Sequence, residues 1–204
     1  MQASNQVGTI RSKLAELERR DSARRIFGSK LPDGHGYIRR PCLTTNRIEE
    51  MERRFGVELP TELRVLLSQV AGGGAGPGYG LSVTADKSTL ARRAKPFPFS
   101  DEDAARVIAA RRSRGDPWSA LELPTADEDD AEDDDWPPGP GFIPLAHHGC
   151  GITSVVVVSG VQRGLVWCGD MSWCPEFDSE GRQLGVLAWY EDWLNRSLEE
   201  LKNP

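Results

Sequence analysis

The side chains best suited to chemistry lie in one short segment, His147-His148-Gly149-Cys150. A histidine beside a cysteine can form a base–nucleophile pair, but neighbours in the sequence need not meet in the fold. A metal site requires ligands that converge at about 2.0–2.3 Å, and the spacing of Cys42, Cys168 and Cys174 does not predict this. We therefore expect no enzyme, no metal and no other cofactor. The segment is interpreted as a strand end and a turn, with a hydrolase or transferase using His147 and Cys150 as an alternative.

A glycine-rich segment, Gly72–Gly80 (GGGAGPGYG), is the second place where a ligand could bind. A phosphate-binding P-loop requires G-x-x-x-x-G-K-[ST] between a strand and a following helix. Here the glycines follow a predicted helix and include no lysine. We expect them to end that helix and to lead into a strand at Tyr79–Val83.

Acidic side chains concentrate in the run 127–135, DEDDAEDDD. The net charge of the chain is −6, and without these eight acids it would be about +2. The run has three interpretations: a solvated loop, an acidic surface that attracts a basic partner such as a nuclease toxin, or a segment folded over the chain's own arginine pairs. Repulsion between the acids and phosphate argues against a nucleic-acid partner. The acids considered as partner-binding residues are Asp127, Glu128, Asp129, Asp130, Glu132, Asp133, Asp134 and Asp135.

Three of the six tryptophans, Trp118, Trp136 and Trp173, lie in predicted loops. Tryptophan is enriched at the energetic centres of protein interfaces, so these three are candidate partner-binding residues. The alternative is that each ring packs back onto its own domain. The other three tryptophans, at 167, 189 and 193, are expected to pack a helix on the sheet.

Four segments have the apolar spacing of amphipathic helices. They are Asn5–Phe27, Ile48–Phe55, Leu63–Val70 and a C-terminal segment from Trp189 to Leu201. Gly56 offers a left-handed cap at the end of the second. A further helix is predicted to begin at Ser100, with acids in its first turn and arginines in its last.

The predicted strands after the helix pair are Phe142–Ala146, Ile152–Ser159 and Leu165–Cys168. Ile152–Ser159 is apolar throughout, which is typical of a central strand covered on both faces. Residues 116–141 are acidic and proline-rich, and we expect a long, mobile insertion loop there.

The order of these patterns resembles the SUKH superfamily over about Ile48 to Leu201. The resemblance rests on IEEMERRFGVELPTELRVLLSQVAGGGAGPGYG at 48–80, then F-I-P-L-A, G-L-V-W and a closing helix with Trp189, Trp193 and Leu198. Its best-known members are bacterial immunity proteins that bind and neutralise polymorphic toxins, and fungal cell-wall regulators are relatives.

The predicted fold class is α+β: N-terminal helices packed on a mostly antiparallel sheet, a long acidic insertion loop and a closing C-terminal helix. We expect one domain over residues 1–204. The longest apolar run, at 155–158, is too short to span a membrane, and the first residues lack the pattern of a signal peptide, so the expected location is the cytoplasm.

The resemblance implies a non-enzymatic immunity protein that neutralises a cognate toxin by stoichiometric occlusion. Its partner would be a polymorphic toxin domain, for which a nuclease or a deaminase are both options. A regulatory or scaffolding protein-interaction module without a toxin partner is the alternative function.

Overall fold

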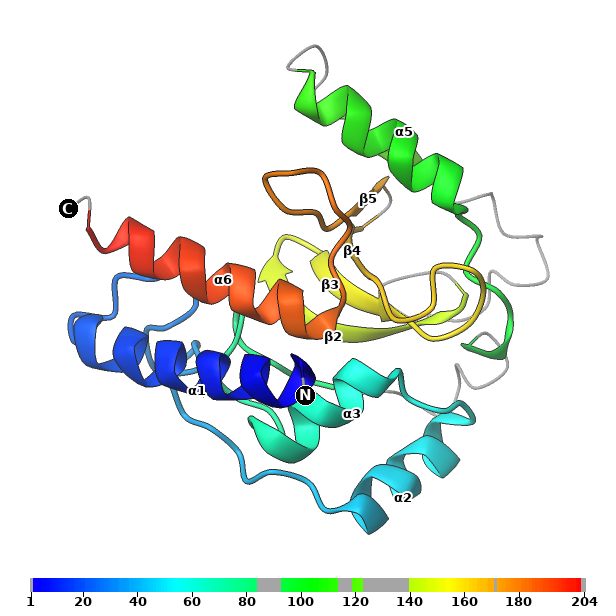
Figure 1. Cartoon of the computed structure of the whole chain (residues 1–204). Coiled ribbons are helices and arrows are strands. Elements are labelled where there is room, and N and C mark those ends of the chain that lie inside the picture. Colours follow the sequence, from blue (N-terminus) through cyan, green and yellow to red (C-terminus); the bar gives the residue numbers. More distant parts are fainter. Residues whose placement is uncertain (1, 84–92, 114–118, 123–139, 171, 203–204) are drawn as a thin grey trace.

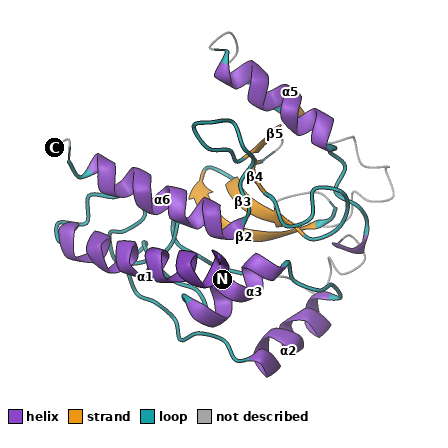
Figure 2. Ribbon diagram, viewed as in Figure 1, coloured by secondary structure: helices purple, strands orange, loops and turns teal. Residues whose placement is uncertain are grey.

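A computed structural model describes residues 2–83, 93–113, 119–122, 140–170 and 172–202 (Figure 1). These residues form the α+β arrangement that the sequence predicts, with an antiparallel sheet and a C-terminal helix (Figure 2). The helices in chain order are α1 (Gln2–Arg20), α2 (Thr45–Phe55), α3 (Thr61–Gln69), α5 (Asp101–Arg112) and α6 (Val186–Glu200).

The helix ends show why these segments fold as they do. α2 begins where the Thr44 side chain accepts a hydrogen bond from the Arg47 amide, and ends at Gly56, which has the predicted left-handed conformation with φ of 70°. α5 begins with a reciprocal capping box between Ser100 and Asp103, so the Ser100 cap is also confirmed. The first turn of α6 is capped in a different way, because the Leu187 amide donates to the carboxylate of Glu62 on α3, at 3.0 Å.

The sheet has the strand order β1-β5-β4-β3-β2, and every neighbouring pair is antiparallel. Its strands are β1 (Leu121–Glu122), β2 (Phe142–Gly149), β3 (Ile152–Val157), β4 (Val166–Gly169) and β5 (Ser172–Pro175). β3 lies between β4 and β2, so the central position predicted for the apolar segment is confirmed. The register of β2 on β3 shifts twice, between Pro144 and Ala146 and between His147 and Gly149.

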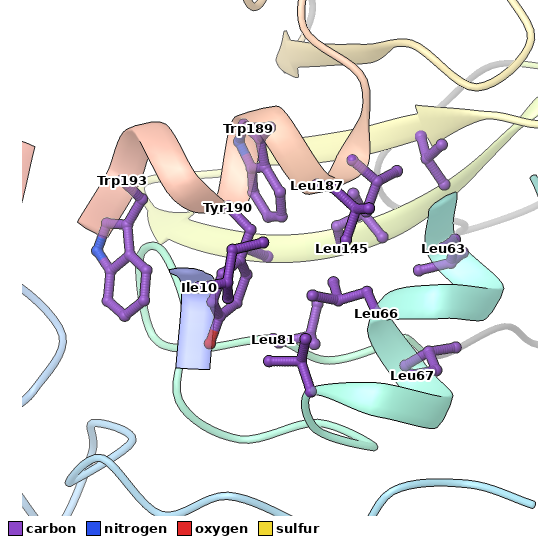
Figure 3. Close-up of a cluster of buried hydrophobic side chains, with 14 of the residues drawn as sticks. Ile10, Leu63, Leu66, Leu67, Leu81, Leu145, Leu187, Trp189, Tyr190 and Trp193 are labelled. Carbon is purple, nitrogen blue, oxygen red and sulfur yellow. The ribbon is translucent and has the colours of Figure 1, made fainter. Parts of the chain in front are cut away.

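The main core lies between one face of the sheet and helices α1, α3 and α6 (Figure 3). It contains the apolar stripe predicted for the first helix, Val7, Ile10, Leu14 and Leu17. Other fully buried side chains of this core are Leu63, Leu66, Leu67, Leu145, Leu187, Trp189 and Tyr190. α1 is also joined to α6 by an ion pair between Lys13 and Glu191, with 2.7 Å between nitrogen and oxygen. The N-terminal helix thus covers α6 rather than remaining an unpartnered amphipathic segment.

A second, smaller core covers the opposite face of the sheet beneath α5. Its aromatic members are Phe97, Phe99, Phe142, Trp167 and Trp173, and the ring of Phe97 contacts all four of the others. Both cores combine residues that precede position 120 with residues that follow it.

The structure corrects the prediction that Trp173 lies in a loop. Trp173 is part of β5, where it pairs with Leu121 and Gly169, and its side chain is fully buried. The physical reason is that the two-residue strand β1, inside the predicted 116–141 loop, extends the sheet beside β5 and helps to cover the second core. Residues 121–122 are therefore regular structure in a segment that was predicted to be a loop.

Two other element predictions are wrong. α1 ends at Arg20 instead of near Phe27, because the Asp21 carboxylate accepts the amides of Arg25 and Ile26 and turns the chain away. The predicted strand Tyr79–Val83 forms only isolated bridges at Leu81, because Gly78 and Gly80 have φ of 58° and 112° and interrupt the extended backbone.

The core predicts a clear stability difference between two apolar truncations. Leu66 is fully buried, so Leu66→Ala should lower the free energy of unfolding by about 2–5 kcal/mol. Val161 is 72% exposed, so Val161→Ala should change it by less than about 0.5 kcal/mol. Urea denaturation followed by circular dichroism measures both, and similar values for the two variants would contradict the packing described.

Candidate protein-binding surface

Most of the residues that the sequence suggested for partner binding lie outside the described part of the chain. These are the acidic run 127–135 together with Trp118 and Trp136. The strands on either side of the run, β1 and β2, form opposite edges of the sheet. Trp173 is described, but its buried indole cannot serve as an exposed anchor.

The segment 147–150 separates its chemical groups instead of gathering them. His147 is exposed and its ring stacks on Tyr79, whereas the His148 ring points inward, with its Nε2 atom 2.8 Å from the Ser154 hydroxyl. Cys150 is exposed in the β2–β3 turn with φ of 50°. Across the described residues there is no group of three or more His, Cys, Asp or Glu side chains placed to hold a metal ion.

His148 begins a polar chain that runs inward across the sheet. The Ser154 hydroxyl also contacts the Cys168 thiol, and this thiol in turn contacts the Glu176 carboxyl group. Burial raises the pKa of Cys168 to about 12 and also raises that of Glu176, so the thiol is protonated and weakly nucleophilic at neutral pH. Ser154 has no exposed surface. The buried Ser154 hydroxyl thus links the half-buried side chains of His148 and Cys168, and the raised pKa of the thiol argues against its use as a nucleophile.

The exposed apolar side chains instead gather where two irregular segments meet the β2–β3 end of the sheet. Phe27 and Tyr79 are 57% and 43% exposed, and their ring centroids lie 5.4 Å apart. The Tyr79 ring in turn stacks on His147 at 6.1 Å. Ile152, 41% exposed, pairs with Gly149, and an added Cβ at Gly149 would lie 3.7 Å from the Tyr79 ring. We call Phe27, Tyr79, His147 and Ile152 the aromatic surface.

Two glycines allow the aromatic surface to form. A Cβ atom added at Gly28 would lie 1.7 Å from the Gly78 carbonyl oxygen, and one added at Gly78 would lie 2.2 Å from that of His147. Both residues also have positive φ, of 75° and 58°. The backbone of the loop 21–41 can therefore touch the 72–81 segment, which is itself joined to β2 by a hydrogen bond from the Tyr79 amide to the His147 carbonyl, at 2.9 Å.

A buried carboxylate organises the loop behind Phe27. Asp21, 1% exposed, accepts hydrogen bonds from the amides of Arg25 and Ile26 and from the hydroxyls of Ser29 and Tyr37, the last at 2.7 Å. Burial alone would raise the pKa of Asp21, but these donors outweigh it and the pKa lies below its usual value. The negative charge is thus held in place by four donors from a single loop.

His35 connects this loop to α6. Its Nδ1 atom accepts the Tyr37 amide, and its ring meets the edge of Trp193 with centroids 5.9 Å apart. Burial, and to a lesser extent the charge of Arg24, lower the pKa of His35 from 6.5 to about 4, so the imidazole is neutral at pH 7. Since Nδ1 accepts a hydrogen bond, the proton of the neutral ring lies on Nε2, which is buried and has no hydrogen-bond partner among the described residues.

Two further exposed apolar residues lie in the same loop. Leu31 and Ile38 are 53% and 61% exposed. The Leu31 side chain packs against Gly36, where an added Cβ atom would lie 3.1 Å from it. The Ile38 carbonyl accepts a hydrogen bond from the Ala75 amide. The 72–81 segment is tied to the core as well, because the Tyr190 hydroxyl of α6 donates to the Ala75 carbonyl at 2.6 Å.

Comparison with known proteins identifies the family of the chain. The SMI1 / KNR4 family (SUKH-1) matches residues 42–196, about three quarters of the chain. The chain belongs to this family. The SUKH superfamily includes toxin-immunity and regulatory proteins that bind protein partners, and it is not typically enzymatic. No curated protein and no solved structure matches the chain. None of its described helices has the length and apolar character needed to cross a membrane.

The family match divides the aromatic surface in two. Tyr79, His147 and Ile152 lie within the matched residues, whereas Phe27 and most of its loop precede them. The sequence analysis placed Phe27 at the end of a helix and Tyr79 in a strand, so it did not bring these two side chains together. The available signal was the presence of large apolar side chains at Phe27, Leu31 and Ile38 among glycines and prolines, where polar residues are usual.

The buried histidine predicts a pH dependence of stability. Between pH 6.5 and about 4 the unfolded chain binds a proton at position 35 that the folded protein does not, so stability should fall as the pH falls through this window. The loss in the free energy of unfolding that His35 causes over this pH window is on the order of 2–3 kcal/mol.

Urea denaturation of the wild type and of His35→Gln at pH 7 and pH 4.5 measures this contribution. The loss of stability on acidification should be smaller in His35→Gln, while His147→Gln, altered at an exposed ring, should keep the wild-type loss. Equal losses in all three proteins would show that His35 is not held neutral by the fold.

Proposed function

We propose that this chain is a non-enzymatic immunity protein that neutralises a bacterial toxin by binding it stoichiometrically. The aromatic surface would cover the toxin's active site or an essential neighbouring surface. The observation that carries the proposal is a set of exposed aromatic and aliphatic side chains on a SUKH domain, held in position by buried contacts. Large apolar side chains in an ordered, exposed cluster are typical of protein-interaction sites.

The support beneath the surface favours tight binding. Asp21, His35 and the close glycine contacts fix the loops before a partner arrives, so little conformational entropy would be lost on association. Tyrosine, phenylalanine and histidine rings also bring few rotatable bonds to an interface.

The alternative is a regulatory or scaffolding module without a toxin partner, because the superfamily contains regulators as well as immunity proteins. The gene neighbourhood separates the two. An adjacent gene for a protein that ends in a nuclease or deaminase domain favours immunity and supplies the toxin domain for binding experiments.

The proposal predicts which truncations weaken binding to that toxin domain. Phe27→Ala and Tyr79→Ala should each weaken the affinity by about 2 kcal/mol, roughly thirtyfold, because they remove central apolar contacts. Val161→Ala, which truncates an exposed side chain in the turn at the opposite end of β3, should bind as the wild type does.

Isothermal titration calorimetry measures affinity and stoichiometry together, and circular dichroism checks that each variant is folded. One equivalent of wild-type protein should abolish the toxin's catalytic activity. Full inhibition by the folded Phe27→Ala,Tyr79→Ala double variant at one equivalent would place the binding site elsewhere.

A further inference from the structure

The loop 21–41, which carries Phe27, has an uneven charge. Residues 21–41 contain five basic side chains (Arg24, Arg25, Lys30, Arg39 and Arg40) and two acidic ones, Asp21 and Asp33. Asp21 is buried and its charge is satisfied inside the loop, so Asp33 is the one acid of this segment that reaches the surface. The loop that presents Phe27 is thus basic, although the whole chain has a net charge of −6.

Three of the cations are available to a partner. Arg24 lies over the Tyr37 ring at 4.8 Å and Arg39 forms an ion pair with Glu18 at 3.2 Å, so both have partners inside the protein. Arg25, Lys30 and Arg40 are exposed and form no ion pair with any residue in the described ranges. Arg25 and Lys30 lie two residues before and three residues after Phe27, in the loop held by Asp21.

We propose that the partner meets the aromatic surface with an acidic protein face, in which carboxylates surround an apolar side chain. The apolar side chain would contact Phe27 and Tyr79, and the carboxylates would pair with Arg25, Lys30 and Arg40. This inference rests on the proposed function for the location of the site, and it adds the chemistry of the partner. The inferred partner face is acidic, whereas the acidic run 127–135 suggested a basic partner.

One observation favours a protein over a nucleic acid. A phosphate backbone would be attracted by the same cations, and bases could stack on aromatic rings. However, the Tyr79 ring is already in contact with the rings of Phe27 and His147, so a stacked base would compete with these contacts for the ring faces.

The charge pairs should act chiefly on association rate and specificity. Exposed ion pairs each contribute little to affinity, whereas complementary surfaces accelerate encounter in a manner that salt suppresses. Arginine can also engage a carboxylate through two parallel hydrogen bonds, which favours a fixed geometry at Arg25 and Arg40.

Peptide probes test the partner chemistry with the full chain. Three fluorescein-labelled probes are compared by anisotropy: a 15-residue Glu-Glu-Leu repeat, the matched Lys-Lys-Leu repeat and a 12-nucleotide oligouridylate. The acidic peptide should bind best, and raising the salt should weaken it. Preference for the basic peptide or the oligonucleotide, or no binding of the acidic peptide, would overturn the inference.

Charge reversal identifies the residues responsible. Arg25→Glu,Lys30→Glu should weaken binding of the acidic peptide by at least about tenfold, because two attractions become repulsions. The matched control is Arg53→Glu,Arg54→Glu on α2, which makes the same change in net charge at two exposed arginines and should stay within about twofold of the wild type. Equal effects of the two variants would show that only the net charge matters and would overturn the site.

Two further outcomes assign the surface differently. If replacing the acids of 127–135 by Asn and Gln strengthens binding of the acidic peptide about tenfold or more, the chain's own acidic run occupies the surface and the inferred partner is wrong. If Phe27→Ala weakens binding of the neighbouring toxin domain but Arg25→Glu,Lys30→Glu leaves it unchanged or strengthens it, the proposed function stands and the acidic partner is excluded.

Discussion

The close approach of three backbone segments at Gly28, Gly78 and His147 is the constraint on which the proposed surface depends. No other residue type could occupy positions 28 and 78, because a Cβ atom at either would overlap a carbonyl oxygen. This contact joins the loop after α1 to the 72–81 segment, and joins that segment to the edge of the sheet. Phe27, Tyr79 and His147 become neighbours as a consequence, although they are far apart in the sequence.

The helices and the sheet support this arrangement, and the exposed groups lie in two loops and at the β2–β3 end of the sheet. The sheet packs against α1, α3 and α6 on one face and against the aromatic core beneath α5 on the other, so both faces are covered. α6 then reaches the loops through two side chains, Tyr190 to the Ala75 carbonyl and Trp193 to the His35 ring. Function in this protein is therefore expected at the sheet edge and the loops that cover it, where apolar side chains remain exposed.

Local signals predicted the parts of the fold that depend on neighbouring residues. Ser100 and Gly56 act through backbone groups within one turn, and the apolar run in β3 requires burial wherever it lies, so caps and central strand followed from the sequence. Trp173 and Tyr79 could not be placed in this way. Trp173 is buried because the distant Leu121 extends the sheet beside it, and Tyr79 is exposed because glycines interrupt its predicted strand. Both outcomes depend on contacts between segments remote in the sequence.

The central claim is that a protein partner binds the aromatic surface. Hydrogen–deuterium exchange of the full chain, alone and with a saturating amount of the partner that the gene neighbourhood identifies, tests this claim most directly. Partner binding should protect the backbone amides of residues 26–31, 77–80 and 147–152 and leave those of the 160–164 turn unchanged. Protection confined to the acidic run 127–135, or to α5, with no change at these three segments, would contradict the claim.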